Sequence, residues 1–174
     1  MRSGNRVLAQ PCSIVPLLLV VGLCVAVPSD VEGAGRREVV EQESPAATLE
    51  GTWRVEITLL NCQTGEPLRD PFPALATFAR GGTVTTSDGG LSPTARGAGH
   101  GVWWRTEGRT FAAIAEAFLF GPTGALSGRQ RLVQLIELDG SGTEFEAKVS
   151  STILNTIGQV VAVGCARSVG RPID

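Results

Sequence analysis

The side chains best suited to chemistry stand between residues 100 and 116. His100 is the only histidine of the 174-residue chain, and it lies in the segment GAGHGVWW. A histidine can act as a general base, and Glu116, set among alanines in AAIAEAF, is the most unusual carboxylate. Burial among apolar neighbours would raise the pKa of such a carboxyl group. An enzyme such as a cyclase or isomerase would need His100, Glu116 or Arg105 to converge on one cavity. The alternative is that His100 lies in a turn and Glu116 faces solvent.

The remaining motifs do not predict a cofactor or a metal site. Gly97, Gly99 and Gly101 have the spacing of a phosphate-binding loop, but they precede a predicted strand instead of a helix. One histidine and the cysteines Cys62 and Cys165 are too few ligands for zinc, and no CxxC or HxxxH spacing occurs. We therefore predict no cofactor and no metal.

The composition argues against nucleic acid as a partner. The formal net charge is −2, and the 15 basic residues, all arginines except Lys148, are scattered along the chain. Tyrosine is absent, so aromatic platforms for stacking bases are not expected.

The N-terminus has the pattern of an export signal. Arg2 and Arg6 precede an apolar run over residues 14–27, which is shorter than the roughly 20 residues that a membrane span needs. Gly33 or Ala26 fits the last position before a cleavage site. We therefore predict a secreted or periplasmic protein with no transmembrane span after cleavage. An uncleaved anchor is one alternative, and a lipoprotein modified at Cys24 is another, although the preceding leucine is too large for the usual small residue.

Cleavage would leave two cysteines in a chain with three parts. We predict a signal peptide over residues 1–33, a flexible charged leader over 34–48 and a single domain over 49–174. Cys62 and Cys165 remain in that domain, and a cysteine pair in an exported protein predicts one disulfide bond. Two buried free thiols are the alternative.

Alternating apolar and polar residues, separated by turn signals, predict eight strands. The expected strands cover residues 52–59, 74–80, 83–87, 101–106, 109–120, 129–138, 143–154 and 159–167. Residues 91–99 are expected to form a loop. The alanine-rich segment 111–120 could be a helix on propensity alone, but a two-residue turn before it and Gly121–Pro122 after it favour a strand.

Sequential strands with short turns predict an all-β fold, an up-and-down antiparallel barrel of eight strands. Closure removes the exposed strand edges that an open sheet would carry. A β-sandwich is the alternative, but its crossovers need longer connections. In a barrel of this size the side chains either fill the interior or leave room for one small ligand. Whether the interior is filled or leaves room for a ligand depends on whether the alanine face of residues 111–120 points inward.

The segment GTW at residues 51–53 resembles the Gly-x-Trp signature of the lipocalin and calycin barrels. The wider pattern is similar to exported bacterial lipocalin-like proteins of unknown function, in the segments GTWRVEITLLNCQTGEPL, LATFARGGTVT, GHGVWW and GQVVAVGCARSVGRPI. This resemblance implies a lipocalin-like barrel that binds a small apolar molecule. Independently of it, Trp53 near the start of the first strand is expected to cover one end of the core.

These observations favour a secreted or envelope barrel that binds a small apolar molecule without catalysis. The candidate ligand-binding residues are Trp53, His100, Trp104 and Glu116. Trp103 and Trp104 are adjacent, so one is expected inside the barrel and the other outside. An enzyme using Glu116 or His100, and a filled structural or interaction barrel, are the alternatives.

The predicted disulfide constrains the register at the barrel seam. Simple antiparallel pairing of the first and eighth strands would place Cys165 opposite Trp53, too far from Cys62 for a bond. We therefore predict that barrel shear slides the eighth strand along the second half of the first, so that residues up to Ser168 face Gln63. A bend in the first strand is the alternative.

Overall fold

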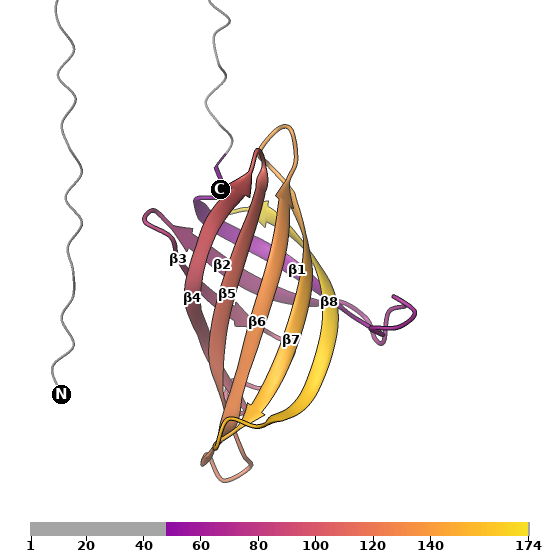
Figure 1. The fold of residues 1–174 in the computed structure, drawn as a ribbon, viewed down its shortest axis with the longest axis vertical. Helices are drawn as coiled ribbons and strands as arrows, with labels where there is room; N and C mark the ends of the chain where they lie inside the picture. Colours follow the sequence, from indigo (N-terminus) through magenta and orange to yellow (C-terminus); the bar gives the residue numbers. More distant parts are fainter. Residues whose placement is uncertain (1–47, 174) are drawn as a thin grey trace, which may run out of the picture. The chain divides into compact units, whose positions relative to one another are not determined.

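The computed structural model describes residues 48–173, which form eight antiparallel strands closed into a barrel (Figure 1). The strands are β1 (Gly51–Leu60), β2 (Phe72–Ala79), β3 (Thr83–Asp88), β4 (Arg96–Glu107), β5 (Thr110–Phe120), β6 (Leu126–Leu138), β7 (Phe145–Asn155) and β8 (Val160–Pro172). Each strand pairs with the next in sequence, and β8 pairs with β1. The predicted up-and-down barrel is confirmed, and the alanine-rich segment is a strand. The predicted signal peptide and almost all of the predicted leader lie outside the described residues.

Alternation of side chains places one face of each strand in the core. In β1, Trp53 and Val55 are buried, whereas Arg54 and Glu56 are exposed. In β5, Phe111, Ala113, Ala115 and Ala117 are buried on the inner face. The period of two in the sequence therefore groups the residues of each strand by face, and the structure decides that the alanine face of β5 points inward.

Aromatic rings fill the end of the barrel where β1 begins. Trp53 is 2% exposed, and its indole Nε1 donates a hydrogen bond to the carbonyl oxygen of Leu49 at 3.0 Å. Its ring lies 5.0 Å from that of Phe145, and Phe78 packs edge-on against both Phe145 and Trp103. Trp53 thus covers one end of the core, as predicted, and Trp103 is the inward member of the tryptophan pair.

Three strands extend at least three residues beyond one of their predicted ends. β4 begins at Arg96 and not at residue 101, because an irregularity between Arg96 and Gly99 lets the strand continue its pairing with β5. The backbone N–H of Phe120 donates to the carbonyl of Ala95, which ties the start of β4 to the end of β5. The expectation that residues 91–99 form a loop was therefore wrong for its second half. β6 and β8 also extend beyond their predicted bounds, to Leu126 and Pro172.

β8 is shifted along β1 relative to simple end-to-end pairing, and a disulfide bond links the two edges of this seam. Trp53 lies opposite Pro172 and Leu60 lies opposite Cys165, so β8 is displaced in the predicted direction. Cys62 and Cys165 are bonded, with their Cα atoms 5.3 Å apart. The displacement is smaller than expected, because Ser168 faces Ile57 and not Gln63.

Candidate functional site

A cavity of about 270 Å³ lies inside the barrel, next to the aromatic layer around Trp53. Val55 and Phe145 line it on the side of that layer. Apolar side chains on β1, β2, β6 and β7 make up most of its surface, including Ile57, Leu59, Phe72, Leu132, Val149 and Ile153. The structure therefore combines a filled half and a hollow half in one barrel.

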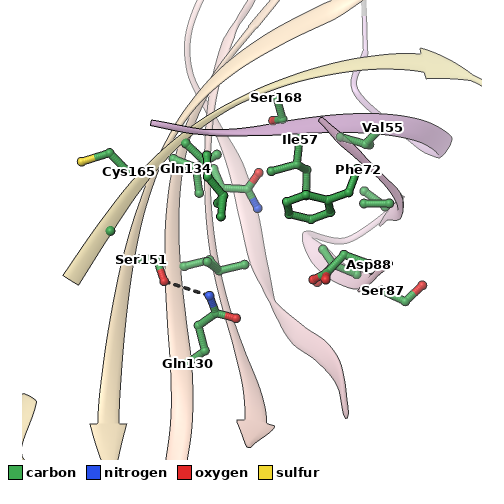
Figure 2. A pocket seen from close by; sticks show the side chains of 18 of the residues that line it. Val55, Ile57, Phe72, Ser87, Asp88, Gln130, Gln134, Ser151, Cys165 and Ser168 are labelled. Atoms are coloured by element: carbon green, nitrogen blue, oxygen red, sulfur yellow. Dashed lines mark hydrogen bonds between the residues drawn. The ribbon is translucent and has the colours of Figure 1, made fainter. Parts of the chain in front are cut away.

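Polar side chains occupy part of the cavity wall and connect four strands. Arg96 on β4 is buried, and its Nη1 lies 2.8 Å from a carboxylate oxygen of Asp88 on β3. Arg96 Nε donates to the side-chain oxygen of Gln130 on β6 at 2.7 Å. The amide nitrogen of Gln130 donates in turn to the hydroxyl of Ser151 on β7 at 2.8 Å, the bond drawn in Figure 2. This chain of bonds satisfies a buried charge with a counter-charge and a neutral acceptor.

Gly99 makes room for the Thr86 hydroxyl beside Arg96. A Cβ atom at Gly99 would lie 3.6 Å from Arg96 Nη2 and only 2.5 Å from the hydroxyl oxygen of Thr86. The Thr86 hydroxyl is fully buried and makes no hydrogen bond in the described part of the protein. Gly99 is therefore required by close packing, and this explains a glycine whose spacing had suggested a phosphate-binding loop.

The alanine face of β5 points inward, but the cavity lies against other strands. Ala113, Ala115 and Ala117 are at most 3% exposed, and none of them lines the cavity. Gly99 pairs with Ala117, so Arg96 lies over the wall where small residues of β4 and β5 meet. The small residues of β5 therefore do not enlarge the cavity, and the hollow space lies elsewhere in the barrel.

The four candidate ligand-binding residues from the sequence lie outside the cavity lining. Trp53 belongs to the aromatic layer, and its neighbour Phe145 lines the cavity in its place. His100, Trp104 and Glu116 are on the outer face of the barrel, where His100 and Glu116 are directly opposite each other on β4 and β5. A ligand-binding role for these residues stays a prediction.

Glu116 is held by arginines at the barrel surface. Its carboxylate lies 3.4 Å from Arg129 and 3.9 Å from Arg131, and its side chain is 42% exposed. The convergence of His100 and Glu116 on an interior cavity, which the enzyme alternative requires, is not seen. Glu116 instead takes the surface position that the sequence analysis weighed against a role as an interior acid.

The polar residues of the cavity were not identified from the sequence. The sequence pattern could have identified two of them. Gln130 and Gln134 alternate with outward residues and share a face with Ile136 and Leu138. No comparable signal marks Arg96, which stands in a segment with the composition of a loop.

Within residues 48–173, no three potential metal-ligating side chains form a cluster that could hold an ion. No helix in this part of the chain is long and apolar enough to cross a membrane. No protein-family model matches the sequence, and no curated protein is significantly similar to it.

Proposed function

We propose that this protein is a lipocalin-like barrel that binds a small, mostly apolar molecule in its interior, without catalysis. The observation that carries the proposal is the cavity of about 270 Å³ inside the barrel, next to the aromatic layer around Trp53. Ligand sites in proteins are typically concave and apolar, with a few polar groups that orient the ligand. The lining fits that description, since Ile57, Leu59 and Val149 lie beside Gln130 and Gln134.

The volume indicates the size of the part of a ligand that the cavity encloses. A cavity of about 150 Å³ holds benzene, and drug-sized ligands occupy about 300 Å³ or more. At the ratio of volume to atoms found for benzene, this cavity holds about ten non-hydrogen atoms. A single ring with a short chain matches that size, whereas haem, retinoids and long fatty acids exceed it.

Filling the cavity tests the proposal. Gly164 lines the cavity, and a Cβ atom there would meet only the Cβ of Ser151, at 3.9 Å, so a larger side chain can enter the space. Butylbenzene, a probe of about the right size, is titrated into the protein and followed by NMR shifts of backbone amides around the cavity. We expect binding to the native protein and at least about tenfold weaker binding to Gly164→Leu, because the leucine occupies the ligand's volume.

The matched control is Gly140→Leu, in the turn between β6 and β7. A Cβ at Gly140 meets no atom within 4 Å, so this variant adds the same side chain outside the cavity. It should bind butylbenzene like the native protein. Native mass spectrometry of protein purified from its own host then identifies a natural ligand. Absence of butylbenzene binding to native protein would contradict the proposal.

We further propose that the chain is exported. The apolar run over residues 14–27 with Arg2 and Arg6 before it supports export. The bond between Cys62 and Cys165 supports it independently, because disulfides persist in oxidising compartments. N-terminal sequencing of the protein from culture supernatant or periplasm should show a start near Ala34. An intact Met1 in a soluble cytoplasmic fraction would contradict export.

A further inference from the structure

The polar side chains around the cavity form two groups. Those of Asp88, Gln130 and Ser151 bond to Arg96 or to each other. The hydroxyls of Thr86, Ser87 and Ser168 and the carboxamide of Gln134 line the same cavity but make no side-chain hydrogen bond within the described barrel. The second group therefore retains its full hydrogen-bonding capacity.

Two of these unpaired groups, on Gln134 and Ser168, lie on the inner face of the barrel. Ser168 is only 3% exposed, and Gln134, on β6, extends its carboxamide into the cavity toward Phe72 (Figure 2). A buried polar group without a partner loses its hydrogen bonds to water and regains nothing from the protein. A ligand that hydrogen-bonds to these groups would remove that cost. Gln134 offers two N–H donors and one carbonyl acceptor, and Ser168 offers a hydroxyl that can donate or accept.

The charges at the cavity cancel. Asp88 is the ionisable residue in the lining, and it is paired with the buried Arg96 at 2.8 Å. Arg96 Nε is also engaged, by Gln130. An anionic ligand would have to leave water and compete with Asp88 for the same guanidinium group, at a large desolvation cost. The site therefore disfavours a carboxylate and accepts a neutral polar group.

We propose, resting on the binding function proposed above, that the ligand has an uncharged hydrogen-bonding end group that contacts Gln134. A hydroxyl, carbonyl or amide satisfies this requirement, and Ser168 provides a second contact on the same cavity. The rest of the ligand fills the apolar space along β1, β2 and β7. The site thus selects a neutral amphiphile of about ten non-hydrogen atoms over an ionised acid of the same length.

Three phenylalkane probes of similar size test the choice of end group. Butylbenzene carries no polar group, phenylpropanol ends in a hydroxyl, and phenylpropanoate ends in a carboxylate. Each is titrated at neutral pH into native protein and into Gln134→Leu, which keeps the side chain's approximate volume but removes its hydrogen-bonding groups. We expect Gln134→Leu to weaken phenylpropanol about tenfold and to leave butylbenzene unchanged, while phenylpropanoate binds native protein at least about tenfold more weakly than phenylpropanol.

The control variant is Gln63→Leu, because Gln63 is an exposed residue that does not line the cavity. It should reproduce the native affinities for all three probes. If phenylpropanoate binds native protein as tightly as phenylpropanol, or if Gln134→Leu affects butylbenzene and phenylpropanol equally, the end-group inference is wrong while interior binding stands. If no probe binds native protein, the proposed binding function fails, and this inference fails with it.

Discussion

Burial of Arg96 carries a large local free-energy cost, because its side chain is only 4% exposed. Removing a guanidinium ion from water costs several kcal/mol unless partners replace the water. Asp88 supplies the counter-charge, and Gln130 accepts a further hydrogen bond. The pair stabilises the fold only while both members are present, since each would be an uncompensated buried charge without the other.

Asp88→Asn should therefore destabilise the protein strongly. The amide keeps the size of the side chain and an oxygen that can accept from the N–H of Gly90, so the change isolates the charge. We expect a loss of about 3–5 kcal/mol in the free energy of unfolding, measured by urea titration. The control is Glu144→Gln, which breaks the exposed pair with Arg171 and should cost less than about 1 kcal/mol. Equal losses for the two variants would show that Arg96 does not depend on Asp88.

At the scale of the elements, the turn between β6 and β7 depends on one carboxylate. The backbone N–H groups of Ser141, Thr143 and Glu144 donate to Asp139, as does the Ser141 hydroxyl. Gly142 has a φ of +75°, which glycine adopts without strain. The hydrogen bond from the Ser141 hydroxyl, followed by those from the backbone, lowers the pKa of Asp139 from 3.8 to about 2.

Ser141→Ala should raise the pKa of Asp139 from about 2 toward 3.8, because the largest favourable contact with the carboxylate is lost. The lowered pKa means that the turn's contribution to stability is complete above about pH 4 and is lost as the pH falls toward 2. An NMR titration of the Asp139 carboxyl carbon measures the midpoint in the native protein and in Ser141→Ala. Ser127→Ala, at an exposed serine on β6, should leave the midpoint unchanged. An unchanged midpoint in Ser141→Ala would contradict this account of the turn.

At the scale of the whole molecule, closure of the barrel depends on the seam between β1 and β8. These strands come from opposite ends of the barrel sequence and pair from Trp53–Pro172 to Leu60–Cys165. The disulfide bond joins residues separated by 103 positions and lies at the end of this seam. It limits the freedom of almost the whole barrel sequence in the unfolded chain.

Replacing both cysteines with alanine should lower the free energy of unfolding by about 4–5 kcal/mol in the chain-entropy model. The barrel should still form, because the strand pairing and the aromatic layer around Trp53 do not involve Cys62 or Cys165. Urea unfolding measures the loss, and a reducing agent should destabilise native protein but not the double variant. Two alkylated thiols in native, exported protein, found by peptide mapping without reduction, would contradict the bond.

The sequence by itself determined the number of strands, their order and the faces of those with clear alternation. It also indicated Trp53 as the cover of the core and Cys62–Cys165 as the bonded pair. These features are local, since side-chain periodicity and turn residues act within a few positions of the chain. The sequence pattern also contained the two glutamines on the inner face of β6, although not their role.

Only the tertiary structure decided which inner residues meet across the barrel. Arg96 contacts Gln130, 34 positions away, and Gln130 contacts Ser151 on the next strand. Periodicity shows which residues share a face, but the height of each residue in the barrel depends on the registers of all eight strand pairs together. A small error in predicting the shift of β8, or the start of β4, therefore gives wrong positions for the cavity's residues relative to one another. His100 and Glu116, prominent in the sequence, lie on the outer face because the alanine face of β5 points inward and these two residues pair on the opposite face. The cavity is instead lined mostly by residues that no sequence motif marks.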